Sequence, residues 1–274
     1  MSSTSRGPGV GPWTGAEVDP TAAHSARMWN YWLGGKDNFE IDRQVAEEHA
    51  AKFPGIVHVA RQVRAFLVRS VTLLAAEAGV RQFLDIGTGL PTANNTHEVA
   101  QRVSPDARIV YVDNDPLVLV HAQALLVGTA EGLTDYIEAD VREPERILAE
   151  AARTLDFNEP IGLMMLGVLG QIPDADDPRG IVRTLVDALP SGSFVVIEDG
   201  VDTDTAQNDA IGDYNENPDS TASYHLRSVG FLTSYFDGLD LLPPGVVSCS
   251  RWRPDMRALA APEVPDYGGV ARKP

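Results

Sequence analysis

Residues 81–91 read Arg-Gln-Phe-Leu-Asp-Ile-Gly-Thr-Gly-Leu-Pro, an apolar stretch that runs directly into a glycine turn. Residues 83–86 are typical of a short buried strand, and Asp85, Gly87 and Gly89 form a D-x-G-x-G pattern. Glycine has no Cβ, so a ligand can lie against the main chain of such a turn. Open α/β sheets bind nucleotides where a strand passes through such a turn into a helix. Because Asp85 would repel a diphosphate, the pattern favours a ligand that carries an ammonium or sulfonium group.

Alternating strands and helices continue after this turn. We expect strands at 83–86, 108–112, 134–138, 161–168 and 193–198, with helices at 93–102, 116–127, 144–153 and 180–189. This alternation predicts a doubly wound, mostly parallel sheet with right-handed crossovers. A polar segment at 202–218 is expected over the sheet edge, followed by a helix at 226–236. Strands at 246–250 and 270–272 would form an antiparallel pair, giving an α/β fold with a seven-stranded Rossmann-like sheet.

The segment before the glycine turn has a different pattern. Residues 1–20 are rich in Gly, Ser, Pro and Thr, which predicts a disordered tail. An aromatic segment at 24–33 ends in Gly34-Gly35, a pair that would stop a helix. Helices are expected at 41–51 and 56–78, the second from its apolar spacing. The predicted organisation is a tail at 1–20, a helical cap at 21–80 and a ligand-binding α/β domain at 81–274.

The composition restricts the class of partner. Among 274 residues, 22 are Lys or Arg and 39 are Asp or Glu, for a net charge of −17. Tight binding to a nucleic-acid backbone needs clustered basic residues, so a small-molecule partner is favoured over DNA or RNA. No apolar run approaches the roughly 18 residues that cross a bilayer, and the N-terminus does not resemble a secretory signal. With a lone Cys249, these features predict a cytoplasmic protein without a membrane partner.

Acidic residues also follow the second and third predicted strands. Asp113 stands where the second strand should end, and a carboxylate there can accept both hydroxyls of a ribose. Its neighbours Asn114 or Asp115 could equally cap the next helix before Pro116. Asp140, just past the third strand, could accept the amino group of an adenine whose ring packs on the next residue. Acids at three successive strand ends therefore predict one ligand site.

Together these residues resemble the motifs of class I S-adenosylmethionine-dependent methyltransferases. A more specific resemblance is to an actinobacterial S-adenosyl methyltransferase family, formerly catalogued as a domain of unknown function. Its N-terminal signature is similar to Trp29-Asn-Tyr-Trp-Leu-Gly-Gly-Lys-Asp-Asn-Phe39, with Arg43 following. The resemblance covers residues 20–274 and includes the stretches at 161–174, 236–239, 244–247, 252–254 and the C-terminal Gly-Gly-Val-Ala-Arg-Lys-Pro.

The resemblance implies S-adenosylmethionine as the cofactor. It implies that the first turn holds the methionine moiety, that Asp113 holds the ribose and that Asp140 with Val141 holds the adenine. Gly167 would lie near the sulfonium, and Tyr31, Lys36 and Asn38 would close the pocket or serve as a helix cap and core contact. The implied cofactor-binding residues are Asp85, Gly87, Thr88, Gly89, Asp113, Asn114, Asp140, Val141, Gly167, Tyr31, Lys36 and Asn38.

Two positions depart from common patterns. Leu90-Pro91 replaces the third glycine that commonly follows a D-x-G-x-G turn, a replacement that is usual in this family. Gly170-Gln171 stands where the family usually carries a histidine and an aromatic residue. No catalytic residue is assigned, because methyl transfer needs mainly in-line positioning and removal of a proton. Candidate bases, expected to be solvated loop residues, are Glu198, Asp199, Tyr224 and His225. Arg227 could pair with a substrate carboxylate or have an ordinary surface role.

The sequence thus favours an S-adenosylmethionine-dependent methyltransferase acting on a small molecule. Because Gly170 stands where a histidine is usual, a second hypothesis is a sensor that binds the cofactor without transferring its methyl group. A third hypothesis is an NAD-dependent oxidoreductase, although Thr92 stands where the last glycine of an NAD fingerprint would be. The methyltransferase hypothesis requires that the side chains of Asp85 and Asp113 face one shared hollow.

Overall fold

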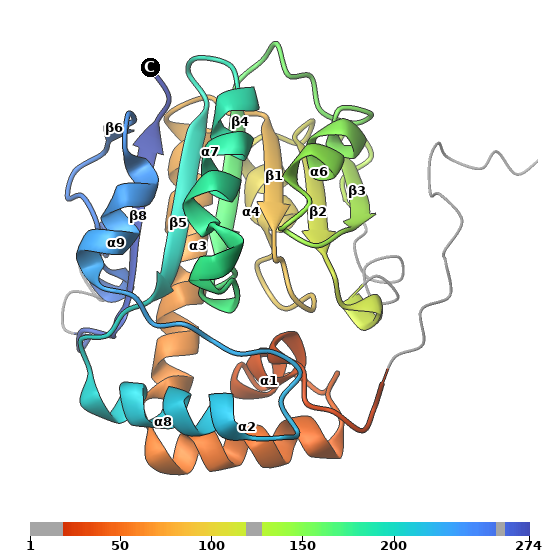
Figure 1. Cartoon of the computed structure of the whole chain (residues 1–274). Coiled ribbons are helices and arrows are strands. Elements are labelled where there is room, and N and C mark those ends of the chain that lie inside the picture. Colours follow the sequence, from red (N-terminus) through yellow and green to blue (C-terminus); the bar gives the residue numbers. More distant parts are fainter. Residues whose placement is uncertain (1–18, 119–127, 256–260) are drawn as a thin grey trace, which may run out of the picture.

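The computed structural model describes residues 19–118, 128–255 and 261–274. It has eight strands: β1 (Gln82–Ile86), β2 (Arg108–Asp113), β3 (Leu133–Glu138), β4 (Ile161–Leu166), β5 (Phe194–Gly200), β6 (Asp240–Leu241), β7 (Val247–Ser248) and β8 (Asp266–Arg272). The strand order is β3-β2-β1-β4-β5-β8-β6, and β7 pairs with β8 outside this path (Figure 1). The first five strands pair in parallel, while β8 is antiparallel to β5. The predicted doubly wound, mostly parallel sheet is confirmed, with one strand more than expected.

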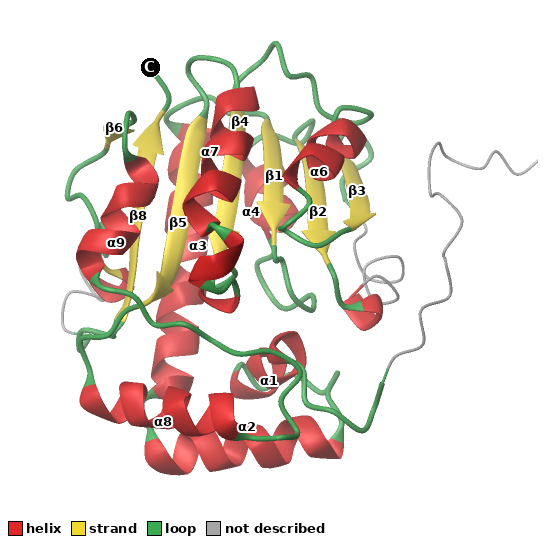
Figure 2. Cartoon of the chain, viewed as in Figure 1, coloured by secondary structure: helices red, strands yellow, loops and turns green. Residues whose placement is uncertain are grey.

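Helices cover both faces of the sheet (Figure 2). One face packs against α3 (Ile56–Ala76) and α4 (Thr96–Val103), and the other against α6 (Pro144–Ala151), α7 (Pro178–Ala188) and α9 (Val229–Thr233). Successive residues of β1 alternate between these two cores: Phe83 packs on the α3 side, whereas Leu84 and Ile86 pack on the α7 side. This alternation explains why the central strands β1, β4 and β5 carry apolar residues on both faces.

Three helices lie beyond the carboxyl ends of the parallel strands (Figure 1). They are α1 (Ser25–Trp32), α2 (Glu40–Lys52) and α8 (Thr205–Glu216). The third lies within the polar segment at 202–218, which was expected over the sheet edge and for which no helix was predicted. Asp204 caps this helix by accepting a hydrogen bond from the Gln207 backbone, and the helix packs against α2. The helix could not be predicted from apolar spacing, because only one narrow side of it, with Ala210 and Tyr214, is buried and its other residues are mostly polar.

Several boundaries differ from the expected ones for local reasons. The strand expected at 161–168 ends at Leu166, because Gly167 turns the chain with a φ of 69°. The helix expected at 93–102 begins at Thr96, where Asn95 and Glu98 form a capping box. The helix expected at 226–236 begins only after its N-cap, Ser228, and ends in a 3-10 turn.

The two late strands also differ from their expected bounds. β7 covers two residues of the expected 246–250, and β8 begins at 266 because it pairs with β5 along seven residues. The tail predicted at 1–20 and the helix predicted at 116–127 lie largely outside the described residues. Within the described part of the chain, no helix is long and apolar enough to span a membrane.

Candidate functional site

The glycine turn after β1 is fixed by its backbone angles and hydrogen bonds. Gly87 and Gly89 have φ angles of 72° and 65°, in the left-handed region that favours glycine. A Cβ on Gly87 would lie 2.5 Å from the Cβ of Val168, so the segment after β4 could not approach as closely. The Gly87 amide donates to the Val112 carbonyl at 2.8 Å, and the Gly89 amide donates to Oδ2 of Asp113 at 2.8 Å. These bonds fix the turn against the end of β2.

Asp85 and Asp113 lie on the same face of the sheet. Asp85 pairs with Tyr111, and Asp113 follows two residues later on β2, so both side chains project to one side. They are 4% and 7% exposed, and both line one cavity of about 470 Å³ at the carboxyl ends of the strands. The shared hollow that the methyltransferase hypothesis requires is present.

Burial raises the pKa of both carboxyls. The pKa of Asp85 rises to about 6, against the opposing effects of a hydrogen bond from Thr96 and the charge of Arg64. Thr96 Oγ1 donates to Asp85 Oδ2 at 2.6 Å. The pKa of Asp113 is also raised by burial, although the backbone amides of Asp115 and Gly89 donate to it. A positively charged ligand group near Asp85 would restore its ionised form.

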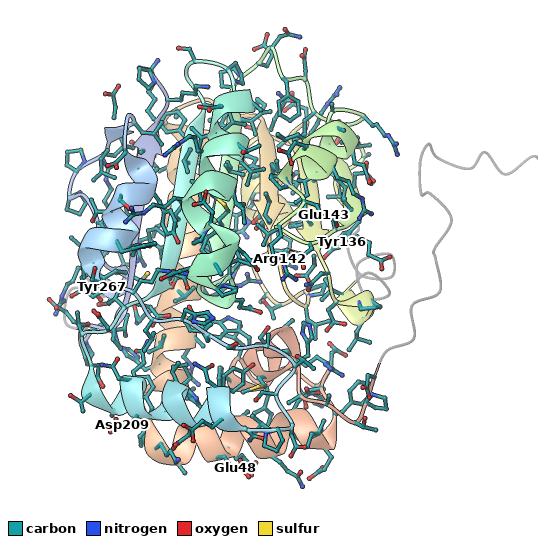
Figure 3. All side chains as sticks on the ribbon, in the orientation of Figure 1. Glu48, Tyr136, Arg142, Glu143, Asp209 and Tyr267 are labelled. Atoms are coloured by element: carbon teal, nitrogen blue, oxygen red, sulfur yellow. The ribbon has the colours of Figure 1, made fainter. Side chains whose placement is uncertain are left out.

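Asp140 is bound to a neighbour that the sequence analysis did not single out. Arg142 donates to its two carboxyl oxygens, from Nε at 2.9 Å and from Nη2 at 2.6 Å, and these bonds lower the pKa of Asp140. Asn114 approaches Asp140 from the end of β2, at 3.5 Å. Asp140, Val141 and Arg142 all line the cavity, and Figure 3 labels Arg142 near the strand ends.

Gly167 provides open space at the end of β4. No atom lies within 4 Å of the position that its Cβ would take, and the residue lines the cavity together with Thr88. Its amide donates to the Glu198 carbonyl at 2.9 Å, which joins the ends of β4 and β5. A ligand could therefore approach the main chain here.

The structure places Tyr31, Lys36 and Asn38 outside the cavity walls. The Tyr31 hydroxyl donates to Glu47 at 2.7 Å, Lys36 is exposed, and the Asn38 amide donates to Asn30 at 3.0 Å. That these residues close the pocket over a bound ligand stays a prediction. In this structure the contact of Tyr31 joins α1 to α2, and that of Asn38 holds the turn between the two helices. The side chains that line the cavity from α1 and its N-cap include His24, Ser25, Trp29, Asn30 and Trp32.

Arg64 is a lining residue that the sequence analysis missed. It lies on α3, is largely buried, and donates to Thr92, to the Ala93 carbonyl at 3.1 Å and to Asn95 at 2.9 Å. Burial lowers its pKa, and the Asp85 carboxylate opposes this effect. Its helical position, four residues after Ala60 and three before Leu67 on the buried face, is a signal that could have found it.

His24 is a second lining residue that was not predicted. Its Nδ1 lies 3.2 Å from Oδ2 of Asp115, at the end of β2, and its side chain accepts a hydrogen bond from the Ala26 amide as the N-cap of α1. The contact fixes the beginning of α1 beside the strand ends. No spacing in the sequence connects these two residues.

Gly170 is a glycine because another segment fills its side-chain space. A Cβ there would lie 2.4 Å from the Tyr224 ring and 2.7 Å from Oδ1 of Asp199. The Gly170 amide donates to Asp199 Oδ2 at 2.6 Å, and the Tyr224 hydroxyl donates to Asp199 Oδ1. Burial and Asp199 raise the pKa of Tyr224 well above its usual value, so this phenol stays protonated at neutral pH.

The candidate bases on β5 are buried strand residues and not solvated loop residues. Glu198 is 1% and Asp199 is 4% exposed, and as neighbours in a strand they project to opposite faces. Glu198 lines the cavity, whereas Asp199 is bound by Gly170 and Tyr224 on the other face. His225 lies in a separate, shallower depression with Arg227.

Arg227 is engaged within the protein. Its guanidinium donates to the Leu169 carbonyl at 2.8 Å, to the Ile172 carbonyl at 2.5 Å and to Asp174 at 2.9 Å. This network fixes the segment after β4. It leaves a substrate carboxylate little of the guanidinium to bind.

The cavity residues fit a nucleoside attached to an amino acid. A volume of about 470 Å³ falls within the usual range of small-molecule pockets, roughly 300–1,000 Å³. The buried Asp85 suits an ammonium, and Asp113 suits a diol. The segment with Ala139 and Val141 offers an apolar surface to a ring.

Comparisons with known proteins identify the family of the chain. A DUF574 family protein from Streptomyces avermitilis MA-4680 has a crystal structure with a TM-score of 0.90 and 39% identity, covering 94% of this chain and 100% of its own. A protein from Thermobifida fusca YX has a TM-score of 0.82 and 39% identity, covering 93% and 96%. None of the curated proteins compared with the chain matches it. A family model described as S-adenosyl methyltransferase matches residues 12–274. The chain belongs to this S-adenosyl methyltransferase family, and its cofactor is S-adenosylmethionine.

Proposed function

We propose that the chain transfers a methyl group from S-adenosylmethionine to a small molecule bound in the same cavity. The observation that carries the proposal is the convergence of Asp85, Asp113, Gly167 and Glu198 on one enclosed space. The first three come from strand ends on the cofactor side, and Glu198 extends the lining across β5. Bound S-adenosylmethionine supplies a methyl group that is already activated by the sulfonium.

The methionine end of the cofactor fits the first turn. Asp85 would accept hydrogen bonds from its ammonium group, and the glycine turn would let it lie against the main chain. Arg64 is a candidate partner for its carboxylate, because the guanidinium lies close enough to Asp85 to affect its pKa and lines the cavity. An ion pair of this kind is strongest with a buried guanidinium.

The nucleoside end fits the next two strand ends. Each oxygen of Asp113 accepts one backbone amide, which leaves a lone pair on each for the ribose hydroxyls. Asn114 and Asp140 would bind the adenine edge, and Val141 would pack on its ring. The pairing of Asp140 with Arg142 holds its carboxylate ionised and in place.

The methyl acceptor would occupy the part of the cavity between the cap and β5. Trp29, Trp32, Ile211 and Tyr214 supply apolar walls there, and Glu198 supplies a carboxyl. Side chains from α1, α2 and α8 all contribute to the lining, and these three helices lie beyond the carboxyl ends of the parallel strands (Figure 1). Together with a net charge of −17, a cavity lined from both the sheet and these helices favours a small molecule over a nucleic acid.

Two measurements test the proposal. Calorimetry should show saturable binding of S-adenosylmethionine and of S-adenosylhomocysteine, and isotope from a labelled methyl group should appear in a small molecule from cell extract. If neither compound gives heat or a thermal shift, the proposed cofactor site is wrong. Binding without any methyl incorporation would contradict the transfer step.

The two rival hypotheses are not favoured. The family match points to methyl transfer and not to nicotinamide chemistry. Gly170, which motivated the sensor hypothesis, has a packing explanation, since Tyr224 occupies the space of its side chain.

A further inference from the structure

One wall of the cavity carries hydrogen-bond acceptors that receive no donor. In residues 19–118, 128–255 and 261–274, no N–H group and no hydroxyl of Ser, Thr or Tyr donates to either carboxyl oxygen of Glu198 or to Oε1 of Gln207. Among these residues, the Glu198 carboxyl has only the Asp266 carboxyl as a hydrogen-bond partner, and that bond needs a proton on one of the two acids. The two residues are 1% and 5% exposed, and both line the cavity. Buried polar atoms in proteins nearly always have a partner, and an unpartnered one costs roughly 1–3 kcal/mol. The wall is therefore built for a ligand that brings donors.

The fold brings this group together from three elements. Glu198 on β5 pairs with Gly268 on β8, and Gly200 pairs with Asp266, so Glu198 and Asp266 project to the same face of the sheet. A Cβ on Gly268 would lie 3.1 Å from the Glu198 Cβ and 2.9 Å from the Phe66 ring. Gln207 reaches the pair from α8 and donates to Asp266 Oδ1 at 3.4 Å. We call Glu198, Asp266 and Gln207 the carboxyl wall.

The carboxyl wall has no positive partner in the part of the chain that the structure describes. No Lys, Arg or His there forms an ion pair with Glu198 or Asp266, and no cluster in those ranges could hold a metal ion. The other ionisable neighbours are Asp199, Tyr224 and Cys249. Arg69, which acts on Cys249, donates to the carbonyls of Cys249 and Trp252. The carboxyl groups of the wall therefore lack a positively charged partner among the described residues.

The wall lies beside the place where the cofactor would present its methyl group. Glu198 pairs with Leu166, and its carbonyl accepts the Gly167 amide at 2.9 Å. The registers of β1, β4 and β5 also place Glu198 on the same face as Asp85. The cavity further includes Trp29 and Trp32, whose ring centroids are 5.8 Å apart. Aromatic faces attract an organic cation.

We propose that Glu198, Asp266 and Gln207 bind the protonated amine of the methyl acceptor, so that the substrate is a small molecule with a basic nitrogen on an apolar body. This inference rests on the proposed methyl transfer. An ammonium carries a positive charge and up to three donors. These donors match the three acceptor atoms of the wall that no N–H or hydroxyl donor of the described residues reaches, the two carboxyl oxygens of Glu198 and Oε1 of Gln207. The surrounding aromatic and aliphatic lining suits the apolar body.

The same wall can remove the proton that blocks attack by an ammonium. One N–H bond of the amine breaks and its proton passes to a carboxylate of the wall, which leaves an electron pair on nitrogen. That pair forms the new bond to the methyl carbon as the bond from this carbon to sulfur breaks, and the bonding electrons stay on sulfur. The product is a methylated ammonium, and the carboxyl later returns its proton to solvent.

The ionisation of the wall supports this role. Burial first, and then Asp199, raises the pKa of Asp266 to about 7, and burial with the charge of Asp266 raises the pKa of Glu198 well above its usual value. A carboxyl that titrates near neutral pH is suited to accept a proton from a bound amine.

Calorimetry with matched probes tests the inference. In the presence of saturating S-adenosylhomocysteine, benzylamine and tryptamine are compared with benzyl alcohol and tryptophol, which have the same rings but no charge. We expect at least one amine to bind at least tenfold more tightly than its alcohol. Glu198→Gln should weaken that amine at least tenfold, while the affinity for S-adenosylhomocysteine changes less than twofold. Glu145→Gln, an exposed change on α6, is the matched control and should leave amine binding unchanged.

The outcomes separate this inference from the proposed function. If S-adenosylhomocysteine binds but neither amine is preferred over its alcohol, or if Glu198→Gln has no effect, the amine site is wrong and the cofactor site stands. If S-adenosylhomocysteine itself does not bind, the proposed function fails. Should Glu198→Gln lower the unfolding temperature, Asp266→Asn provides the second variant, with the same expected loss of amine binding and unchanged cofactor binding.

Discussion

The carboxyl groups at the two ends of the cavity differ in their hydrogen-bond partners. On the cofactor side, each strand-end carboxyl has a partner within the chain: Asp85 has Thr96, Asp113 has two backbone amides, and Asp140 has Arg142. On the β5 side, no N–H or hydroxyl donor of the described residues reaches the two carboxyl oxygens of Glu198, and only the Asp266 carboxyl can share a proton with them. The cofactor side is therefore organised before a ligand arrives. On the β5 side, the strongest interaction of the carboxyl groups would be made by the ligand.

The largest expected effect tests the organised region. Asp113→Ala removes both the ribose acceptor and the carboxylate that holds the Gly89 amide at 2.8 Å. We expect S-adenosylhomocysteine affinity to fall about 100-fold, which is about 2.7 kcal/mol. Calorimetry on Asp209→Asn supplies the control, because Asp209 lies on the exposed side of α8, away from the sheet (Figure 3). A loss below threefold would mean that Asp113 does not contact the cofactor.

The second prediction concerns the packing between the two regions. Gly170→Ala would drive a Cβ into the Tyr224 ring and Asp199, and overpacking of this kind costs about 1–3 kcal/mol of the free energy of unfolding. Denaturant unfolding measures the loss. Gly212→Ala on α8 is the matched control, since nothing lies within 4 Å of its Cβ position, and it should be neutral or stabilising. Equal behaviour of the two variants would refute the packing explanation.

The third prediction is that the protein without ligand becomes more stable as the pH falls from 8 to 6. Burial raises the folded-state pKa of Asp266 to about 7 and those of Asp85 and Asp199 to about 6. Between pH 8 and 6 these three carboxyls bind protons in the folded state that they do not bind in the unfolded state, which favours folding by about 2 kcal/mol. Burial lowers the pKa of His49 to about 4 and also lowers that of His97, so these two residues bind protons more readily in the unfolded state and oppose part of the gain. The expected net gain in the free energy of unfolding is about 1 kcal/mol.

Denaturant unfolding at several pH values checks this gain and its source. Asp266→Asn should remove most of the slope between pH 8 and 6, because Asp266 has the highest pKa of the three carboxyls. Asp140 provides the contrast, since Arg142 lowers its pKa and it stays ionised throughout the window. A stability that falls steadily from pH 8 to 6 would contradict the raised pKa values.

The same contrast between the two regions decides what the sequence could predict. The turn with Asp85 and the strand-end Asp113 and Asp140 are visible because each lies within a few residues of a strand and a glycine or helix signal. The carboxyl wall is not visible, because residues 198, 207 and 266 meet only after β8 has inserted antiparallel to β5. The partners of Arg64 and Tyr224 could not be predicted for the same reason, because Asn95 and Asp199 lie 31 and 25 residues away from them in the chain.

The smallest expected effect comes from removing a single hydroxyl on the cofactor side, that of Thr96. Thr96→Val keeps the shape of the side chain but removes the hydrogen bond to Asp85 at 2.6 Å, a bond to a charged group worth about 1.5–3 kcal/mol at most. Because this bond lowers the pKa of Asp85, its loss should raise that pKa further above about 6. We expect cofactor affinity to fall about three- to tenfold at pH 6.5 and less at pH 8, where Asp85 is ionised in either protein.

Thr154→Val is the matched control, because it breaks a hydrogen bond from a threonine to an aspartate, Asp135. Neither Thr154 nor Asp135 lines the cavity, so calorimetry should show no change in cofactor affinity. An equal loss at both pH values would mean that Thr96 acts through packing and not through the charge of Asp85.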